Sequence, residues 1–390
     1  MHLVFVTSIV PGAETTTGYE IANAAILDAL RRAGARVTVV GFAWPGKSPA
    51  GRADLIVLDE VDVRNETASG WRKGEWLAKA LVNNITFASA KMRVKSPAEL
   101  RAALAAIGPF DAYVLNSVQF AGAFPDLFDD KPALYVAHNV EHRSARENAA
   151  AATGLVERLL FAREARLLES VEARLCRQAA FVFTLAEDDR VALGVKNDAR
   201  SVALPLVTRA AISGPEPRDI ACDAAMIGTW TWAPNRIGLD WFLDSVTPLL
   251  PAGFDVRIAG AVPSDLKSAS PNVRFVGRVP DSVGFLRAAA VLPLASTAGT
   301  GVQLKTIETF ELGLPSVATP HSLRGVAGHP ANCVVAETPE AFAAALVEQA
   351  ARREPALDGR AFHHRQREAL DRGVKRGLDA LADALAKRAA

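Results

Sequence analysis

Short apolar runs alternate with longer amphipathic segments along the first half of the chain. The apolar runs predict strands, which are expected at residues 2–7, 36–42, 54–58, 111–115, 133–137, 180–183 and 201–204. The amphipathic segments predict helices at 18–33, between about 73 and 107, and at about 143–178. Strands that alternate with helices in this way indicate a parallel sheet covered by helices on both faces.

A second alternating series follows a stretch of different composition. The segment Ser213–Asp219 combines two prolines, a glycine and charged residues, which is typical of a linker. Beyond it, strands are predicted at 224–228, 254–259, 273–276, 289–294, 315–318 and 332–335, before an Arg- and Ala-rich helix at about 358–388. We therefore predict an α/β protein of two doubly wound domains, whose ligands bind at the carboxyl ends of the strands. The predicted parts are an N-terminal domain at 1–207, a linker at 208–222, a second domain at 223–370 and a C-terminal helix at 371–390 that packs back on the first domain.

Composition narrows the classes of function. A chain of 390 residues, half of them apolar, is long for one domain. Its 44 Lys and Arg nearly cancel its 43 Asp and Glu, so nothing in the overall charge points to nucleic acid as a partner. The three cysteines, Cys176, Cys222 and Cys333, are far apart and form no Cys-x-x-Cys pair, which argues against a disulfide framework and a structural zinc site. A reducing cytoplasm is the expected location.

Membrane contact is expected to be peripheral at most, at the inner face of the membrane. No apolar run reaches the roughly 20 residues that span a bilayer, and Met1–Thr7 is interpreted as a strand rather than a signal peptide. The segment Trp71–Lys95 is rich in basic and aromatic residues, which suits docking on an anionic membrane surface. The alternative is a solvated helix whose aromatic side chains belong to the core.

One stretch, Gly299–Glu308, joins a predicted strand to a glycine turn and a helix. The helix is expected to begin near Gly301, where unpaired N–H groups and the positive dipole end favour a phosphate. Residues 301, 305 and 308 then share one helical face, with the Lys305 ammonium one turn from the phosphate and the Glu308 carboxylate nearly two. A nucleoside diphosphate needs groups in the same order, positive charge at its phosphates and then hydrogen-bond acceptors for its ribose hydroxyls. The alternative is an ordinary strand-to-helix turn.

Several pieces of the chain, taken in order, resemble the retaining glycosyltransferases of the GT4 family. Besides Gly299–Glu308, they are Ile227–Asn235 with Trp241 and Phe242, Val256–Gly260, Val273–Val279, Leu314–Thr319 with Gly325, and Glu340–Phe342. The resemblance covers nearly the whole chain and is strongest after the linker. It implies the GT-B fold, in which two Rossmann-like domains face each other across an active-site cleft.

In that family the C-terminal domain holds the sugar nucleotide, so the resemblance implies a set of residues that bind the sugar donor. They are Gly228, Thr229, Gly277, Arg278, Val279, Gly299, Thr300, Gly301, Val302 and Gln303. The loop at 277–279 would contact the base, residues 301–303 with Lys305 the diphosphate, and Glu308 the ribose. The family has two glutamates eight positions apart, and the first position is Thr300 here, which alters how the donor sugar would be held.

Two features of the first half complete the expected site. His138 directly follows a predicted strand, where side chains meet ligands, although a lone histidine there is commonly a satisfied polar group. The resemblance implies that it contacts the donor sugar and helps stabilise charge near the departing phosphate. The long loop Ser8–Tyr19 precedes a helix, and the resemblance implies that Gly18 lets the backbone approach the donor phosphates or the acceptor. The alternative is a helix cap formed by Thr17.

The expected chemistry is metal-independent. No convincing Asp-x-Asp pair is present, since Asp129–Asp130 and Asp188–Asp189 suit a turn and an exposed helix start. No metal and no cofactor are therefore expected, and Lys305 with the helix dipole would stabilise the leaving diphosphate.

We predict a glycosyltransferase with His138, Lys305 and Glu308 in catalytic roles. It would move a sugar from a UDP- or GDP-sugar to a glycan, lipid-linked or other small acceptor, with retention. The alternatives are a GT-B sugar-nucleotide epimerase or hydrolase and a non-catalytic member that binds nucleotide or glycan, for which Thr300 is the main argument.

Overall fold

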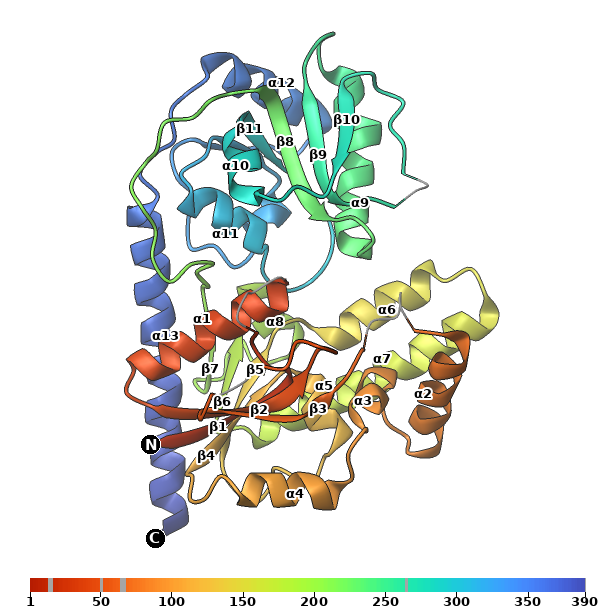
Figure 1. The fold of residues 1–390 in the computed structure, drawn as a ribbon, viewed down its shortest axis with the longest axis vertical. Helices are drawn as coiled ribbons and strands as arrows, with labels where there is room; N and C mark the ends of the chain where they lie inside the picture. Colours follow the sequence, from red (N-terminus) through yellow and green to blue (C-terminus); the bar gives the residue numbers. More distant parts are fainter. Residues whose placement is uncertain (13–16, 50–51, 64–67, 264–265, 390) are drawn as a thin grey trace. The chain divides into compact units, whose positions relative to one another are not determined.

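The computed structural model describes residues 1–390 except 13–16, 50–51, 64–67, 264–265 and 390 (Figure 1). The chain forms two compact units. The first unit comprises Met1–Leu204 and Ala369–Ala390, and the second comprises Pro205–Glu368. The last helix, α13 (Arg360–Ala389), therefore contributes its first residues to the second unit and the rest to the first.

The described part of the first unit holds a seven-stranded parallel sheet in the order β3-β2-β1-β4-β5-β6-β7. Its strands are β1 (His2–Ile9), β2 (Arg36–Ala43), β3 (Leu55–Glu60), β4 (Ala112–Asn116), β5 (Ala133–Ala137), β6 (Phe181–Thr184) and β7 (Ser201–Ala203). Its helices are α1 (Gly18–Arg32), α2 (Gly70–Val82), α3 (Phe87–Met92), α4 (Pro97–Ala105), α5 (Val118–Ala123), α6 (Glu141–Ala151), α7 (Leu155–Gln178) and α8 (Glu187–Ala192). The order of the strands reverses between β1 and β4, which is where doubly wound sheets bind ligands.

The described residues of the second unit repeat this plan with six parallel strands in the order β10-β9-β8-β11-β12-β13. Its strands are β8 (Cys222–Thr229), β9 (Val256–Ala261), β10 (Val273–Gly277), β11 (Ala289–Leu294), β12 (Ser316–Ala318) and β13 (Cys333–Val335). Its helices are α9 (Ala233–Trp241), α10 (Ser282–Arg287), α11 (Leu304–Glu311) and α12 (Pro339–Arg352), with short helical turns at Phe242–Val246, Thr247–Leu249 and Pro320–Leu323. Here the order reverses between β8 and β11.

The strands form because their apolar runs are buried. All five residues of β4 and of β5 are buried, as befits central strands covered on both faces. The fold class predicted from the sequence is confirmed, and both sheets are parallel over the described residues.

Two predicted helices differ from the structure. The single helix expected at 143–178 is two helices, α6 and α7, which are separated near Gly154. The helix expected to begin near Gly301 begins at Leu304. Both Gly299 (φ 100°) and Gly301 (φ 77°) adopt left-handed backbone angles, which an α-helix cannot accommodate.

The C-terminal helix packs tightly within the first unit because it carries glycines. A Cβ atom on Gly377 would lie 2.2 Å from Cζ of Phe183 in β6, and one on Gly373 would lie 2.6 Å from Cδ2 of Leu204. Arg32 of α1 also pairs with Asp371 at 2.6 Å. These contacts attach the end of the chain to the first sheet.

Candidate functional site

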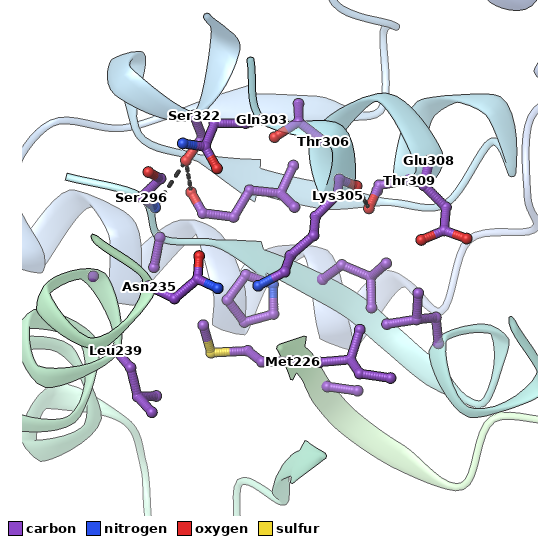
Figure 2. Close-up of a pocket in the computed structure, with 18 of the residues that line it drawn as sticks. Met226, Asn235, Leu239, Ser296, Gln303, Lys305, Thr306, Glu308, Thr309 and Ser322 are labelled. Carbon is purple, nitrogen blue, oxygen red and sulfur yellow. Dashed lines mark hydrogen bonds between the residues drawn. The ribbon is translucent and has the colours of Figure 1, made fainter. Parts of the chain in front are cut away.

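A cavity lies at the carboxyl ends of β8 and β11, where the order of the second sheet reverses. Its polar lining comes from Asn235, Ser296, Gln303, Lys305, Thr306, Glu308, Thr309 and Ser322 (Figure 2). The cavity holds about 60 Å³, far less than the roughly 300–1,000 Å³ of ordinary ligand pockets. It therefore has room for only part of a nucleotide-sized ligand.

Lys305 is the cation of this cavity. Its side chain runs from α11 into the cavity toward Asn235, as Figure 2 shows. The Nζ atom lies 4.7 Å from the centre of the Trp230 ring. Burial lowers the pKa of this ammonium to about 8, while the nearby carboxylate of Glu308 acts in the opposite direction. An anion entering the cavity would meet a poorly solvated positive charge.

The glycine turn before α11 is held from a neighbouring loop. Nη1 of Arg324 donates a hydrogen bond to the carbonyl oxygen of Gly299 at 2.6 Å. Thr300 and Gly301 of the turn are buried, Thr300 with 6 % of its surface exposed, while Val302 and Gln303 are half-buried. Gln303 occupies the N-cap position of α11 and lines the cavity.

Glu308 lies at the edge of the cavity and is already paired. Its Oε1 accepts a hydrogen bond from Nη2 of Arg209 at 2.9 Å. Arg209 is fixed in turn, because its carbonyl oxygen lies 2.9 Å from Nε2 of His363 in α13. Figure 2 shows the Glu308 carboxylate directed away from the end of Lys305. A ligand at this edge of the cavity would therefore meet an ion pair rather than a lone carboxylate.

The other predicted donor-binding residues of this unit do not line the cavity. Thr229 is exposed at the end of β8. Gly228 does not line the cavity but lies beside Lys305, since a Cβ atom on it would lie 2.6 Å from the Lys305 Nζ. Gly277 ends β10 with a left-handed φ of 71°, and the next residues are Arg278, which is exposed, and Val279, which is half-buried. Since β10 is the edge strand of the sheet, this loop lies two strands away from β8.

His138 belongs to a separate polar cluster in the first unit. It follows β5 and is 7 % exposed, and its Nε2 lies 2.8 Å from Oδ1 of Asn116 at the end of β4. The Tyr19 ring lies 4.8 Å from the His138 ring. Burial lowers the pKa of His138 to about 4, so the ring is neutral at pH 7.

Gly18 is the first residue of α1 and lies within a capping box formed by Thr17 and Glu20. The Thr17 hydroxyl accepts from the backbone N–H of Glu20, and the Glu20 carboxylate accepts from the N–H of Thr17 at 2.9 Å. This is the alternative considered for the sequence, and it places a carboxylate at the helix start. Residues 13–16 of the preceding loop lie outside the described residues.

The structure thus brings together Lys305, Glu308, Gln303 and Gly228, while His138 and Gly18 lie in the other unit. Three residues at or near this site, Trp230, Arg209 and Arg324, were not predicted from the sequence. Trp230 lies two residues after Gly228 in a stretch already noted, so its position was a usable signal. Arg209 and Arg324 carry no local signal, because their partners are 99 and 25 residues away.

The residues that the structure describes contain no group of three or more His, Cys, Asp or Glu side chains arranged to hold a metal ion. No helix within the same residues has the length and apolarity needed to cross a bilayer.

Residues 222–351, which contain the cavity, match the family model described as Glycosyl transferases group 1. No curated protein matches the sequence.

Among solved structures, TarM superimposes with a TM-score of 0.62 at 11% identity over 97% of this chain and 98% of its own. HepE from Anabaena in complex with UDP-glucose superimposes with a TM-score of 0.57 at 14% identity, over 99% of this chain and 100% of its own. The catalytic domain of starch synthase IV from Arabidopsis thaliana, bound to ADP and acarbose, superimposes with a TM-score of 0.55 at 11% identity, over 99% of each chain. At these identities the likeness shows a shared fold, the two-domain GT-B architecture.

Proposed function

We propose that this protein is a GT4-like glycosyltransferase that takes its sugar from a nucleoside-diphosphate sugar. The observation that carries the proposal is the position of Lys305, whose Nζ enters a cavity at the point where the second sheet reverses its order. That cavity lies in the segment that matches a glycosyltransferase family model. The presence of UDP-glucose or ADP in two structures of the same fold supports a nucleotide ligand.

In this mechanism the protein supplies the charge that the leaving diphosphate requires. The Lys305 ammonium neutralises the diphosphate, and the N–H groups at the start of α11 donate to its oxygens. Glu308, oriented by Arg209, accepts from the ribose hydroxyls. Transfer proceeds with retention and without a metal ion, and the protein requires no cofactor.

A ligand screen tests the nucleotide site. We expect UDP, GDP or ADP, or the corresponding sugar nucleotide, to raise the melting temperature selectively, because a ligand of the native state stabilises it. The substitutions Lys305→Ala and Glu308→Ala should abolish this shift, whereas Lys267→Ala, at an exposed position of the same unit, should not. If both site variants kept full affinity and turnover, the assignment would be wrong.

Product analysis tests the reaction. With acceptor present, NMR of the product should show the anomeric configuration of the donor, and the rate should be unchanged by EDTA. Turnover of the donor alone would indicate an epimerase or hydrolase instead. Nucleotide binding without any turnover would favour a non-catalytic protein, in line with Thr300 at the first glutamate position.

We further propose a glycan or lipid-linked acceptor and peripheral contact with the inner membrane face from the cytoplasm. The basic side chains of Trp71–Lys95 give only partial support, since Lys79 pairs with Glu75 and Lys95 with Asp59. Trp76 and Met92 are core residues, as the alternative interpretation expected. The stronger support is a set of exposed apolar side chains, Trp71 and Val82 of α2 and Leu155, Val156 and Leu159 of α7.

The helices α2 and α7, which carry these side chains, are joined by a hydrogen bond. Nη2 of Arg163 in α7 donates to the carbonyl oxygen of Ala80 in α2 at 2.9 Å, one turn beyond Leu159. Co-sedimentation with anionic vesicles at low salt is expected, and a Trp71→Ser, Val156→Ser double variant should weaken it. Leu249→Ser, at an exposed apolar residue of the second unit, is the matched control. Absence of vesicle binding by the wild type would rule the contact out.

A further inference from the structure

A chain of buried polar side chains leads to His138. Thr7 and Asn116 are register partners on β1 and β4, the two strands between which the order of the first sheet reverses. Asn23 joins them from α1, and all three residues are fully buried. A buried polar atom left without a partner loses its hydrogen bonds to water without replacement, so these groups must satisfy one another.

The hydrogen bonds between these buried side chains have a fixed direction. The Thr7 hydroxyl donates to the carbonyl oxygen of Ile9 at 3.1 Å, and a carbonyl can only accept. Thr7 Oγ1 therefore accepts from Nδ2 of Asn23 at 3.2 Å. Oδ1 of Asn23 then accepts from Nδ2 of Asn116 at 2.7 Å. The orientation of the Asn116 amide follows from this sequence of bonds.

The last bond sets the tautomer of the histidine. The Asn116 amide presents Oδ1 to Nε2 of His138 at 2.8 Å. Because an amide oxygen only accepts, Nε2 must carry the proton, and in a neutral imidazole Nδ1 is then an acceptor. Tyr19 reinforces this arrangement, since its hydroxyl accepts from Nδ2 of Asn116 at 3.2 Å and lies 2.9 Å from Oγ1 of Thr7.

The charged groups near His138 are engaged elsewhere. Tyr19 of α1, whose pKa is raised by burial, is the titratable group in ring contact. On α6, the carboxylate of Glu141 accepts from Nε2 of Gln119 at 3.2 Å, and Nδ1 of His142 lies 2.6 Å from the carboxylate of Glu172 in α7. Desolvation is the cause of the low pKa of His138, which keeps its ring neutral.

We infer that Asn116 and Asn23 are positioning residues that hold His138 as the neutral Nε2–H tautomer, so that Nδ1 accepts a hydrogen bond from a hydroxyl of a bound sugar. The identity of the ligand rests on the proposed function, whereas the tautomer does not. A neutral acceptor recognises a hydroxyl group and contributes no positive charge to a departing phosphate. The histidine is therefore assigned to sugar recognition rather than to charge stabilisation.

Nitrogen NMR of ring-labelled histidine tests the tautomer in the free protein. The His138 signals are identified by their loss in His138→Gln. We expect one protonated nitrogen, Nε2, and one unprotonated nitrogen, Nδ1, without titration between pH 5.5 and 8. A protonated Nδ1, or an imidazolium in this range, would overturn the inference even if the protein proved to be a glycosyltransferase. The wild-type spectrum is sufficient, so the test does not depend on a variant that folds.

Substitution of Asn116 tests the positioning role. Asn116→Asp keeps the acceptor toward His138 but replaces the Nδ2 donor to Asn23 with a negatively charged oxygen. The pKa of His138 should therefore rise, and the ring should titrate near neutral pH. Transfer by this variant should fall about tenfold at pH 6, the effect of one lost hydrogen bond, and recover as pH rises. Thr7→Ser, which retains the hydroxyl, should keep both the wild-type spectrum and the wild-type pH profile. An Asn116→Asp enzyme with an unchanged pH profile and unchanged ring signals would refute the role.

Discussion

A Cβ atom on Gly228 would lie 2.6 Å from Nζ of Lys305 and 3.0 Å from the Trp230 ring. The missing side chain at residue 228 is what allows the ammonium to rest against the indole at the end of β8. The position of the cation thus depends on a glycine that comes 77 residues earlier in the chain.

The substitution Gly228→Ala is expected to displace the Lys305 ammonium. Because the lysine is the main positive charge offered to the diphosphate, the KM for the sugar donor should rise about tenfold, equivalent to ~1.4 kcal/mol. Steady-state kinetics at varied donor concentration measure this. Gly74→Ala is the matched control, since a Cβ there meets nothing within 4 Å and α2 should gain up to about 1 kcal/mol of stability. An unchanged KM in the Gly228 variant would contradict the prediction.

Lys305 should lower the unfolding free energy of the protein when no ligand is bound. Its pKa of about 8 lies below the ordinary 10.5, so the unfolded chain binds more protons between these values and the unfolding free energy rises with pH across that window. Below pH 8 the penalty of the buried charge is fully present. Lys305→Met should therefore be more stable than the wild type at pH 7, by about 1–3 kcal/mol, with the advantage shrinking toward pH 10.

The same variant should lose affinity for the sugar donor, which separates the two roles of the residue. Denaturant unfolding at pH 7 and pH 10 and calorimetric titration with nucleoside diphosphate provide the two measurements. A Lys305→Met protein less stable than the wild type at pH 7 would show that the ammonium is a structural contact.

Glu311 should make the protein less stable as the pH rises toward neutrality. It is 2 % exposed and accepts from the backbone N–H of Thr208 at 2.9 Å, and burial raises its pKa to about 7. The native state therefore binds more protons than the unfolded chain between about pH 4.5 and 7, so the unfolding free energy falls with rising pH in that window.

Glu311→Gln should remove this dependence, which we expect to amount to about 1–3 kcal/mol between pH 5 and pH 8. Urea unfolding at the two values measures it, with Glu337→Gln, at an exposed residue, as the control. Parallel pH dependence in the wild type and the Glu311 variant would mean that this carboxyl titrates normally.

Gly377→Ala should destabilise the protein, although alanine is the better helix former by about 1 kcal/mol. The added methyl group would meet the ring of Phe183, which is 1 % exposed. Overpacking of a core costs about 1–3 kcal/mol, so the net effect is a loss. A thermal melt decides the sign, and an increased melting temperature would show that the helix shifts freely on the sheet.

Local patterns in the sequence were enough to predict the strands. Each predicted strand has a counterpart among β1–β13, because parallel strands buried on both faces consist of short apolar runs. The break between α6 and α7 was not predicted, since Gly154 follows a run rich in alanine that favours helix. The start of α11 was predicted three residues too early, because the backbone angles of Gly301 depend on the loop around it.

The candidate site was predictable only where its residues are close in sequence. The glycine turn, Lys305 and Glu308 lie within ten residues, so helical geometry relates them directly. The bond between Asn23 and Asn116 joins residues 93 positions apart, and the Arg209–Glu308 pair spans 99. Such partners follow from the order of strands in the sheet, which a single sequence does not specify.

The return of the chain to its first unit governs how the protein can be divided. Residues 205–368 are contiguous and can be encoded as a single fragment, whereas a fragment that stops at Leu204 lacks the helix that covers Phe183. To express the histidine-bearing half alone, Leu204 must be spliced to Ala369 by a short artificial connector. A simple deletion of the C-terminal residues would remove the end of α13 and expose the sheet of the first unit.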